Sequence, residues 1–157
     1  MTIDRADSQP DYVPSPSERV RDQVARYEAS NGAEGGTLEG KPVVILTTTG
    51  ARTGAIRKNP VIRIPYGDNY IAVASNGGAA THPAWYRNLT AHPDLSVQDG
   101  AQVRAVRARE VFGEEKNRLW AVAEQYWPHF PEYRAQAGTR DIPVLVLEPR
   151  NNGEGLN

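Results

Sequence analysis

Thr47–Pro60 reads Thr-Thr-Thr-Gly-Ala-Arg-Thr-Gly-Ala-Ile-Arg-Lys-Asn-Pro and separates two apolar runs rich in β-branched residues. The runs are Val43–Leu46 and Val61–Ile64, and the second ends at the turn-forming residues 65–69. Runs of this length and composition are typical of β-strands. We therefore expect a glycine-rich, cationic loop between two strands. Such a loop can bind phosphate or carboxylate through backbone N–H groups, hydroxyls and guanidinium groups; the alternative is an ordinary hairpin loop with solvated charges.

Charge is unevenly distributed along the chain. The whole sequence has 18 Lys and Arg residues against 19 Asp and Glu residues. Between Glu39 and Asp94, however, six cations stand against one acid, Asp68, which gives this segment a net charge of +5. The asymmetry favours an anionic ligand, and the nearly neutral total favours a small anion over nucleic acid. The six cations are Lys41, Arg52, Arg57, Lys58, Arg63 and Arg87.

Length and composition limit the possible classes of protein. A chain of 157 residues with 39% hydrophobic and 24% charged residues is expected to form one globular domain with a single core. The absence of cysteine excludes disulfides, thiolate metal sites and a cysteine nucleophile. No apolar run approaches the roughly 20 residues that span a bilayer, and the first residues lack the apolar core of a signal peptide. We expect a cytoplasmic protein.

The sequence predicts five segments. Residues 1–14 form a flexible N-terminal lead, 15–31 a helix capped by Ser15, 32–40 a linker, 41–149 the main domain and 150–157 a flexible tail. The apolar side of the helix is a narrow stripe of Val20, Val24 and Tyr27. This stripe either docks on the core or makes a weak contact with a membrane surface, which would place the protein at the inner face of the cell membrane.

The remaining pattern predicts an α+β fold. Strands and short helices are joined by turns without βαβ alternation, which argues against a doubly wound sheet. We expect a split β-barrel, in the sense of a mostly antiparallel six-stranded barrel decorated by short helices. The further strands are expected at Tyr70–Ala74, Leu95–Val97, Val103–Val111 and Ile142–Leu147, and the helices at 84–89, 114–126 and about 131–137.

No familiar catalytic motif is present. The glycines Gly50 and Gly54 are not followed by Gly-Lys-Ser/Thr, no Gly-x-Ser-x-Gly elbow occurs, and the three histidines lack metal-ligand spacing, so no metal site is expected. What remains is a candidate anion loop, a second glycine-rich loop after a strand and an aromatic corner at residues 126–130. This combination favours an enzyme whose bound cofactor does the chemistry.

Four motifs resemble the deazaflavin (F420)-dependent nitroreductase family. They lie in the same order over about residues 40–149 and read Leu46–Gly50 with Arg52-Thr53-Gly54, Arg57 and Asn59-Pro60; Ala74-Ser75-x-Gly77-Gly78-Ala79; Pro83-x-Trp85-Tyr86-x-Asn88-Leu89; and Ile142–Val144. The resemblance implies a split β-barrel reductase that uses the reduced 8-hydroxy-5-deazaflavin coenzyme F420. This coenzyme carries a phosphodiester and an oligoglutamate tail, so its anionic character matches the charge asymmetry.

The resemblance also implies roles for individual residues. The phosphate and tail would be held by Arg52, Thr53, Arg57 and Asn59; the deazaflavin ring would face Ala74, Ser75 and Asn76, with the backbone of Ala84 and Trp85 closing over it; and the substrate would contact Trp127, Phe130 and Tyr133. The chain departs from the family at Ala51, where another cation is expected, and at Ile62, Trp127 and Phe130, where the nitroreductases have tyrosines.

The implied reaction is hydride transfer from the reduced deazaflavin to an electron-poor small molecule such as a quinone, enone or nitro compound. A proton would come from Ser75, Tyr133, His129 or water. Two alternatives remain at this point: a flavin mononucleotide (FMN)-dependent split-barrel oxidoreductase, and a non-catalytic carrier of F420. We expect a monomer or homodimer that does not bind nucleic acid.

Overall fold

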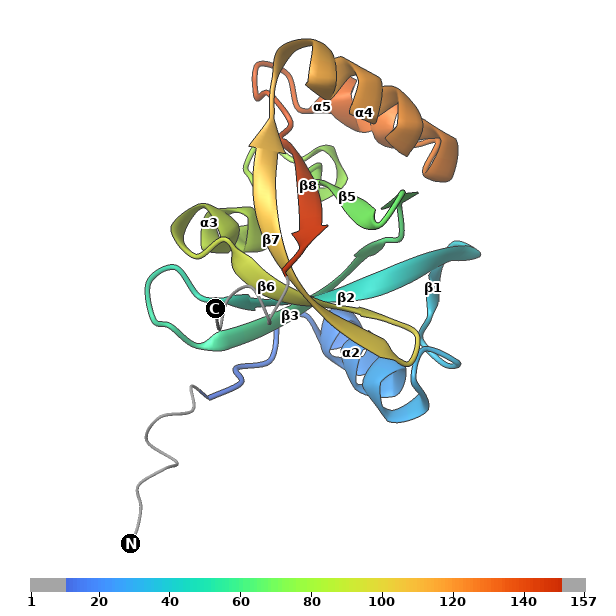
Figure 1. Cartoon of the computed structure of the whole chain (residues 1–157), viewed down its shortest axis with the longest axis vertical. Helices are drawn as coiled ribbons and strands as arrows, with labels where there is room; N and C mark the ends of the chain where they lie inside the picture. The colour runs from blue at the N-terminus through green and yellow to red at the C-terminus, as the bar shows by residue number, and fades with distance from the viewer. Residues whose placement is uncertain (1–10, 151–157) are drawn as a thin grey trace, which may run out of the picture.

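The computed structural model describes residues 11–150, and its order of elements follows the sequence prediction (Figure 1). Within these residues the chain forms one eight-stranded sheet, four α-helices and the short 3-10 helix η1. The elements are α2 (Glu18–Ser30), β1 (Thr37–Leu38), β2 (Lys41–Thr49), β3 (Ile56–Ile62), β4 (Pro65–Tyr66), β5 (Asn69–Val73), η1 (Asn76–Gly78), α3 (Ala84–Ala91), β6 (Asp94–Asp99), β7 (Gln102–Val111), α4 (Gly113–Tyr126), α5 (Phe130–Gln136) and β8 (Val144–Pro149).

The sheet is antiparallel at every strand pair in the described part of the chain. Its order is β1-β2-β6-β7-β8-β5-β4, and β3 pairs with β2 outside this path. The segment that leaves β3 reaches the far edge, where the carbonyl of Ile64 accepts a hydrogen bond from the amide of Ile71 at 2.8 Å. The sheet therefore curls on itself, and the predicted mostly antiparallel, split-barrel α+β class is confirmed.

Strand alternation divides the apolar residues between separate cores. Successive side chains of a strand point to opposite faces, so Val44 and Leu46 of β2 pack on the face covered by α3, whereas Val43 and Ile45 pack against α2. In the same way, β5 and β8 each send one set of side chains toward α3 and the other toward α4 and α5. Figure 1 shows α2 at one end of the molecule and the pair α4–α5 at the other.

Helix α2 is held on the sheet by its narrow apolar stripe. Val24 and Tyr27 are buried against β2, and the Tyr27 hydroxyl accepts a hydrogen bond from the amide of Gly100 at 2.7 Å. The helix ends at Asn31, which has the left-handed conformation of a helix C-cap. At the start of the helix, the prediction of Ser15 as the N-cap was wrong by two residues. The hydroxyl of Ser17, not that of Ser15, accepts the hydrogen bond from the first turn, at Val20.

Several boundaries differ from the sequence prediction. The central loop is shorter than expected, because β2 continues to Thr49 and β3 begins at Ile56, so only residues 50–55 connect them. The final strand begins at Val144 rather than Ile142. Two strands, β1 and β4, were missed because two residues are too few to carry a periodic pattern.

Parts of the segments that were predicted to flank the main domain form hydrogen bonds with it. Within the predicted lead, the carbonyl of Asp11 and the amide of Val13 each form a hydrogen bond of 2.9 Å with the backbone of Ile56, and Tyr12 bridges to the same residue. Within the predicted linker, Thr37 and Leu38 form β1. At the other end, the amide of Arg150 donates to the carbonyl of Ala105 at 2.9 Å. The remainder of the predicted lead, 1–10, and of the tail, 151–157, lies outside the described residues.

Candidate functional site

A pocket of about 460 Å³ lies where β3, the loop after β5, the start of α3 and the α4–α5 corner meet. Eight of the residues proposed from the sequence line it, although they are spread over more than 70 positions of the chain. These eight are Asn59, Ser75, Asn76, Ala84, Trp85, Trp127, Phe130 and Tyr133. Four proposed residues do not line it, namely Arg52, Thr53, Arg57 and Ala74.

The connection between β2 and β3 is a compact loop held by its own hydrogen bonds. The amide of Gly50 donates to the carbonyl of Ala55 at 2.7 Å, and the amide of Ala55 donates to the Thr53 hydroxyl at 3.1 Å. Gly54 has a φ of 75°, in the left-handed region that favours glycine. The glycines therefore close the turn, and Thr53 has a structural role beside any contact with a ligand.

Strand β3 carries a polar row from this loop toward the pocket. Arg57 and Asn59 lie two residues apart, so they share the face that also presents Val61 to the α3 side. Asn59 and Val61 line the pocket. Arg57 precedes these two residues on the same face and does not itself line the pocket.

Two of the six cations in the basic segment are already paired. Lys58 Nζ lies 2.5 Å from Glu28 of α2, and Arg63 Nε lies 2.9 Å from Asp99. Among the described residues, Arg52 and Arg57 have no carboxylate partner. The charge asymmetry along the sequence thus overstates the charge available to a ligand, and these two arginines are the cations that the loop and the start of β3 leave for an anion.

A buried amide fixes the loop to α3. Asn88 is buried, donates from Nδ2 to the Thr48 hydroxyl at 3.1 Å, and accepts at Oδ1 from the amide of Ala51 at 2.9 Å. A buried amide that satisfies partners on two elements sets their relative position. The asparagine of the Trp-Tyr-x-Asn-Leu motif therefore anchors the loop.

A single guanidinium group binds several carbonyls of the loop after β5. Arg140 donates to three backbone carbonyls, those of Ala79 at 2.9 Å, Ala74 at 3.1 Å and Ser75 at 2.6 Å. Ala74 is completely buried, and its amide donates to Pro143. Ala74 therefore supports the loop, whereas Ser75, which is 8% exposed, lines the pocket.

Helix α3 begins at the pocket. Pro83 is its N-cap, and Ala84 and Trp85 are its first residues. The first N–H groups of a helix have no acceptor within the helix and carry partial positive charge. These two backbone donors therefore lie at the pocket edge, where an electron-rich group of a ligand can accept from them.

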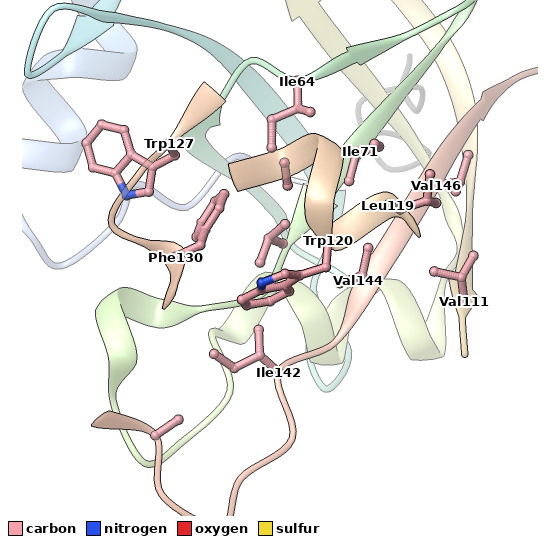
Figure 2. Close-up of a cluster of buried hydrophobic side chains, with 13 residues drawn as sticks. Ile64, Ile71, Val111, Leu119, Trp120, Trp127, Phe130, Ile142, Val144 and Val146 are labelled. Atoms are coloured by element: carbon pink, nitrogen blue, oxygen red, sulfur yellow. The ribbon is translucent and has the colours of Figure 1, made fainter. Parts of the chain in front are cut away.

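The aromatic corner is at once core and pocket wall. Trp127 and Phe130 are 3% and 4% exposed and belong to the core beneath α4 and α5, as Figure 2 shows, yet both line the pocket. Tyr133 lines it as well and lies edge-on to Phe130, with ring centroids 6.3 Å apart. His129 does not line the pocket; its Nε2 lies 3.1 Å from Glu39.

Sequence reasoning missed several pocket residues. Arg19, Val20 and Leu38 come from α2 and β1, which lie outside the four sequence motifs, although the narrow stripe containing Val20 was noted. His82 lines the pocket beside Pro83, and Arg140 supports it from behind. A lone arginine after a helix carries no local signal of such a role. Within residues 11–150, no cluster of His, Asp and Glu could hold a metal ion, and no helix is long and apolar enough to cross a membrane.

Comparison with known proteins identifies the family. Residues 19–149 match the family model described as F420H(2)-dependent quinone reductase. The chain is 35% identical over 136 residues to an F420H(2)-dependent quinone reductase of Mycobacterium tuberculosis, a match that covers 84% of this chain and 89% of that protein.

Two solved structures resemble the chain. An F420-H2 dependent reductase is 42% identical with a TM-score of 0.64, over 68% of this chain and 94% of its own. A structure described as a domain-swapped dimer is 40% identical with a TM-score of 0.66, over 85% of this chain and 100% of its own. The prediction of a deazaflavin-dependent reductase is thereby confirmed, and the chain belongs to the F420H(2)-dependent quinone reductase family.

Proposed function

We propose that this protein is an F420H2-dependent reductase that transfers a hydride to quinones and similar electron-poor, flat acceptors. The observation that carries the proposal is the pocket, which joins an aromatic wall, backbone donors at a helix start and a polar row that begins near Arg52 and Arg57, two arginines with no carboxylate partner within residues 11–150. Each part matches one part of the expected reactants: a conjugated ring, its carbonyl groups and an anionic tail.

The residues present fit the cofactor. Arg52, Arg57 and Asn59 would hold the phosphate and tail, because guanidinium groups form strong charge-assisted bonds to phosphate and carboxylate. Ser75 and the backbone at Ala84 would contact the ring. Bound reduced deazaflavin supplies the hydride, and the protein supplies binding and orientation.

The acceptor would lie against the aromatic corner. Trp127 and Phe130 are packed into the core and so present a fixed surface, and aromatic faces suit stacking with a flat quinone. The hydroxyls of Ser75 and Tyr133 line the same pocket, so either can deliver a proton to the reduced acceptor. His129 is a weaker candidate, because its Nε2 faces Glu39 and its side chain lies outside the pocket lining.

The test is a pair of measurements on the purified protein. Fluorescence titration with F420 and with FMN compares affinities, and anaerobic assays with reduced F420 compare a quinone with a bicyclic nitroimidazole. We expect at least tenfold tighter binding of F420, about 1.4 kcal/mol, and faster reduction of the quinone. Tighter binding of FMN would support the FMN-dependent alternative, and tight F420 binding without turnover would support a carrier.

The oligomeric state is a separate proposal. Because a relative at 40% identity is described as a domain-swapped dimer, we propose a homodimer, with the monomer as the alternative, and sedimentation at two concentrations distinguishes them. Contact with a membrane surface through α2 forms no part of the proposal, since Val24 and Tyr27 of its apolar stripe are buried against β2.

A further inference from the structure

His82 occupies a defined position in the pocket. It stands between η1 and α3, it is half-buried, and it lines the cavity together with Asn76 and Ala84. Its ring packs on Tyr86, with centroids 4.8 Å apart, and its Nδ1 lies 2.9 Å from Nη1 of Arg140. Two neighbours thus hold the imidazole, and the nitrogen that they leave for a ligand is Nε2.

The contact with Arg140 fixes which nitrogen carries the proton. A guanidinium group has only donors and stays protonated in proteins. His82 Nδ1 must therefore accept from Arg140 and cannot carry a hydrogen of its own. A neutral imidazole has one hydrogen, so that hydrogen lies on Nε2.

Arg140 cannot easily turn to relieve this constraint. Its other hydrogen bonds go to the backbone carbonyls of Ala74, Ser75 and Ala79, at 2.6–3.1 Å. The planar guanidinium therefore has its orientation set by three acceptors, and the fourth contact, to His82, follows from that geometry. One side chain both shapes the loop after β5 and orients the histidine.

The surroundings of His82 also favour its neutral form. Burial lowers its pKa from the ordinary value, the positive charges of Arg140 and Arg87 lower it further, and Glu110 opposes them. Glu110 accepts a hydrogen bond from the Tyr86 hydroxyl at 2.6 Å. The groups facing the imidazole from α3, β7 and the segment before β8 therefore leave it neutral at physiological pH.

We infer that His82 is a binding residue of this pocket whose Nε2–H donates a hydrogen bond to an oxygen of the cofactor ring system, and that Arg140 is its positioning residue. The assignment to the cofactor rather than the acceptor follows from its neighbours, since Asn76 and Ala84 belong to the part of the pocket proposed for the ring. This inference rests on the proposed function.

A ligand-free measurement tests the tautomer. Two-bond proton–nitrogen NMR spectra of the full chain distinguish the two neutral imidazole forms, and His82→Gln identifies the signal among the three histidines. We expect the Nε2–H form, titrating below the ordinary histidine pKa of about 6.5. Arg140→Lys should raise the pKa of His82, because a mobile ammonium group replaces the fixed guanidinium group. An Nδ1–H form, or an ordinary midpoint, overturns the inference.

Affinity for oxidised F420, measured by fluorescence, tests the contact itself. His82→Phe removes the donor and should weaken binding about three- to tenfold, as expected for one hydrogen bond. His82→Gln places an amide N–H near the position of Nε2 and should recover most of the affinity. His92→Gln, at an exposed histidine outside the pocket lining, is the matched control and should match the wild type.

The pH dependence separates a ligand contact from a purely structural role. Below the pKa of His82, a proton on Nδ1 would face the Arg140 donors, so the ring must move and wild-type affinity should fall relative to the Gln variant. Equal affinities of the Phe and Gln variants, or a constant ratio of wild type to Gln from pH 5 to 8, overturn the inference. If the wild type binds no F420 at all, the proposed function fails, while the NMR result still decides the tautomer.

Discussion

The connection between β2 and β3 and the aromatic corner between α4 and α5 contribute to the same candidate site in different ways. The connection is short, its Arg52 is exposed, and the hydrogen bonds that hold it run along its own backbone and to Asn88. The corner instead places two of its side chains, Trp127 and Phe130, in the core, where they are almost completely buried.

The contrast shows that the residues of one site can divide between ligand binding and stabilisation of the fold. A cation at the end of the loop contributes little to the fold, because it is solvated when no ligand is bound. A buried aromatic contributes to packing whether or not a ligand is present. Substitutions in the two regions should therefore divide differently between stability and binding.

The largest effect is expected at Trp127. Replacing this buried indole with Ala leaves a cavity between the corner and the core, and should lower the free energy of unfolding by about 3–5 kcal/mol. Denaturant unfolding measures the loss. Phe112→Ala, at a phenylalanine that is 69% exposed, is the control and should change stability by less than about 0.5 kcal/mol.

A milder change at the same position sharpens the result. Trp127→Phe retains most of the packing, so the protein should fold, while the altered wall should raise KM for the quinone and leave the Kd for F420 unchanged. A change in the Kd for F420 of the same size as the change in KM would show that this wall belongs to the cofactor site.

The next effect is expected at Arg57. Removing its guanidinium in Arg57→Ala should weaken F420 binding by about 1.5–3 kcal/mol if it forms a charge-assisted bond to phosphate or carboxylate. The unfolding midpoint should scarcely move. Lys41→Ala removes an exposed cation at the other end of the β2–β3 hairpin and should leave binding unchanged, apart from a small effect at low salt.

The comparison also explains what the sequence could predict. Strand and helix positions followed from local patterns, such as the β-branched runs on either side of the central loop and the turn-forming residues 65–69. Motifs such as Ala-Ser-x-Gly-Gly-Ala located the pocket, because the residues that bind a ligand are concentrated in loops. The extent of β3 was not predicted, because Arg57-Lys58-Asn59-Pro60 is polar and contains a proline, and pairing with β2 overrides that local preference.

Contacts between distant segments could not be predicted at all. Arg140 acts on residues more than 60 positions away, and Lys58 is neutralised by Glu28 on a helix outside the motifs. Trp120 is likewise buried and lies 5.9 Å from Phe130 between ring centroids, a contact between two helices. Such pairings depend on tertiary packing rather than on periodicity.

A smaller effect is expected at Asn88, which connects the loop to α3. Asn88→Ala leaves the buried Thr48 hydroxyl without its partner, and should lower the free energy of unfolding by about 1–2 kcal/mol. Because the amide of Ala51 also loses its acceptor, F420 affinity should fall a few-fold through a less ordered loop. Thr90→Ala on the exposed side of α3 is the control. An unchanged Kd in a destabilised Asn88 variant would show that the loop does not need this anchor.

The smallest effect is expected at Lys58, and it tests the comparison most directly because this residue is adjacent to Arg57 in the sequence. Adjacent residues of a strand face opposite sides, and Lys58 is paired with Glu28 of α2, on the face away from Arg57. Lys58→Ala should therefore leave the Kd for F420 unchanged and lower stability by less than about 1 kcal/mol, the usual range for a partly exposed ion pair. A double-mutant cycle with Glu28→Ala isolates the free energy of the Lys58–Glu28 ion pair.

If Lys58→Ala weakened F420 binding as much as Arg57→Ala, both faces of β3 would contribute to the anion site. Strand alternation would then not determine which cation binds the ligand. If the two neighbours instead differ by the tenfold or more that a charge-assisted bond implies, the fold has divided a run of cations in the sequence between a structural role and a binding role.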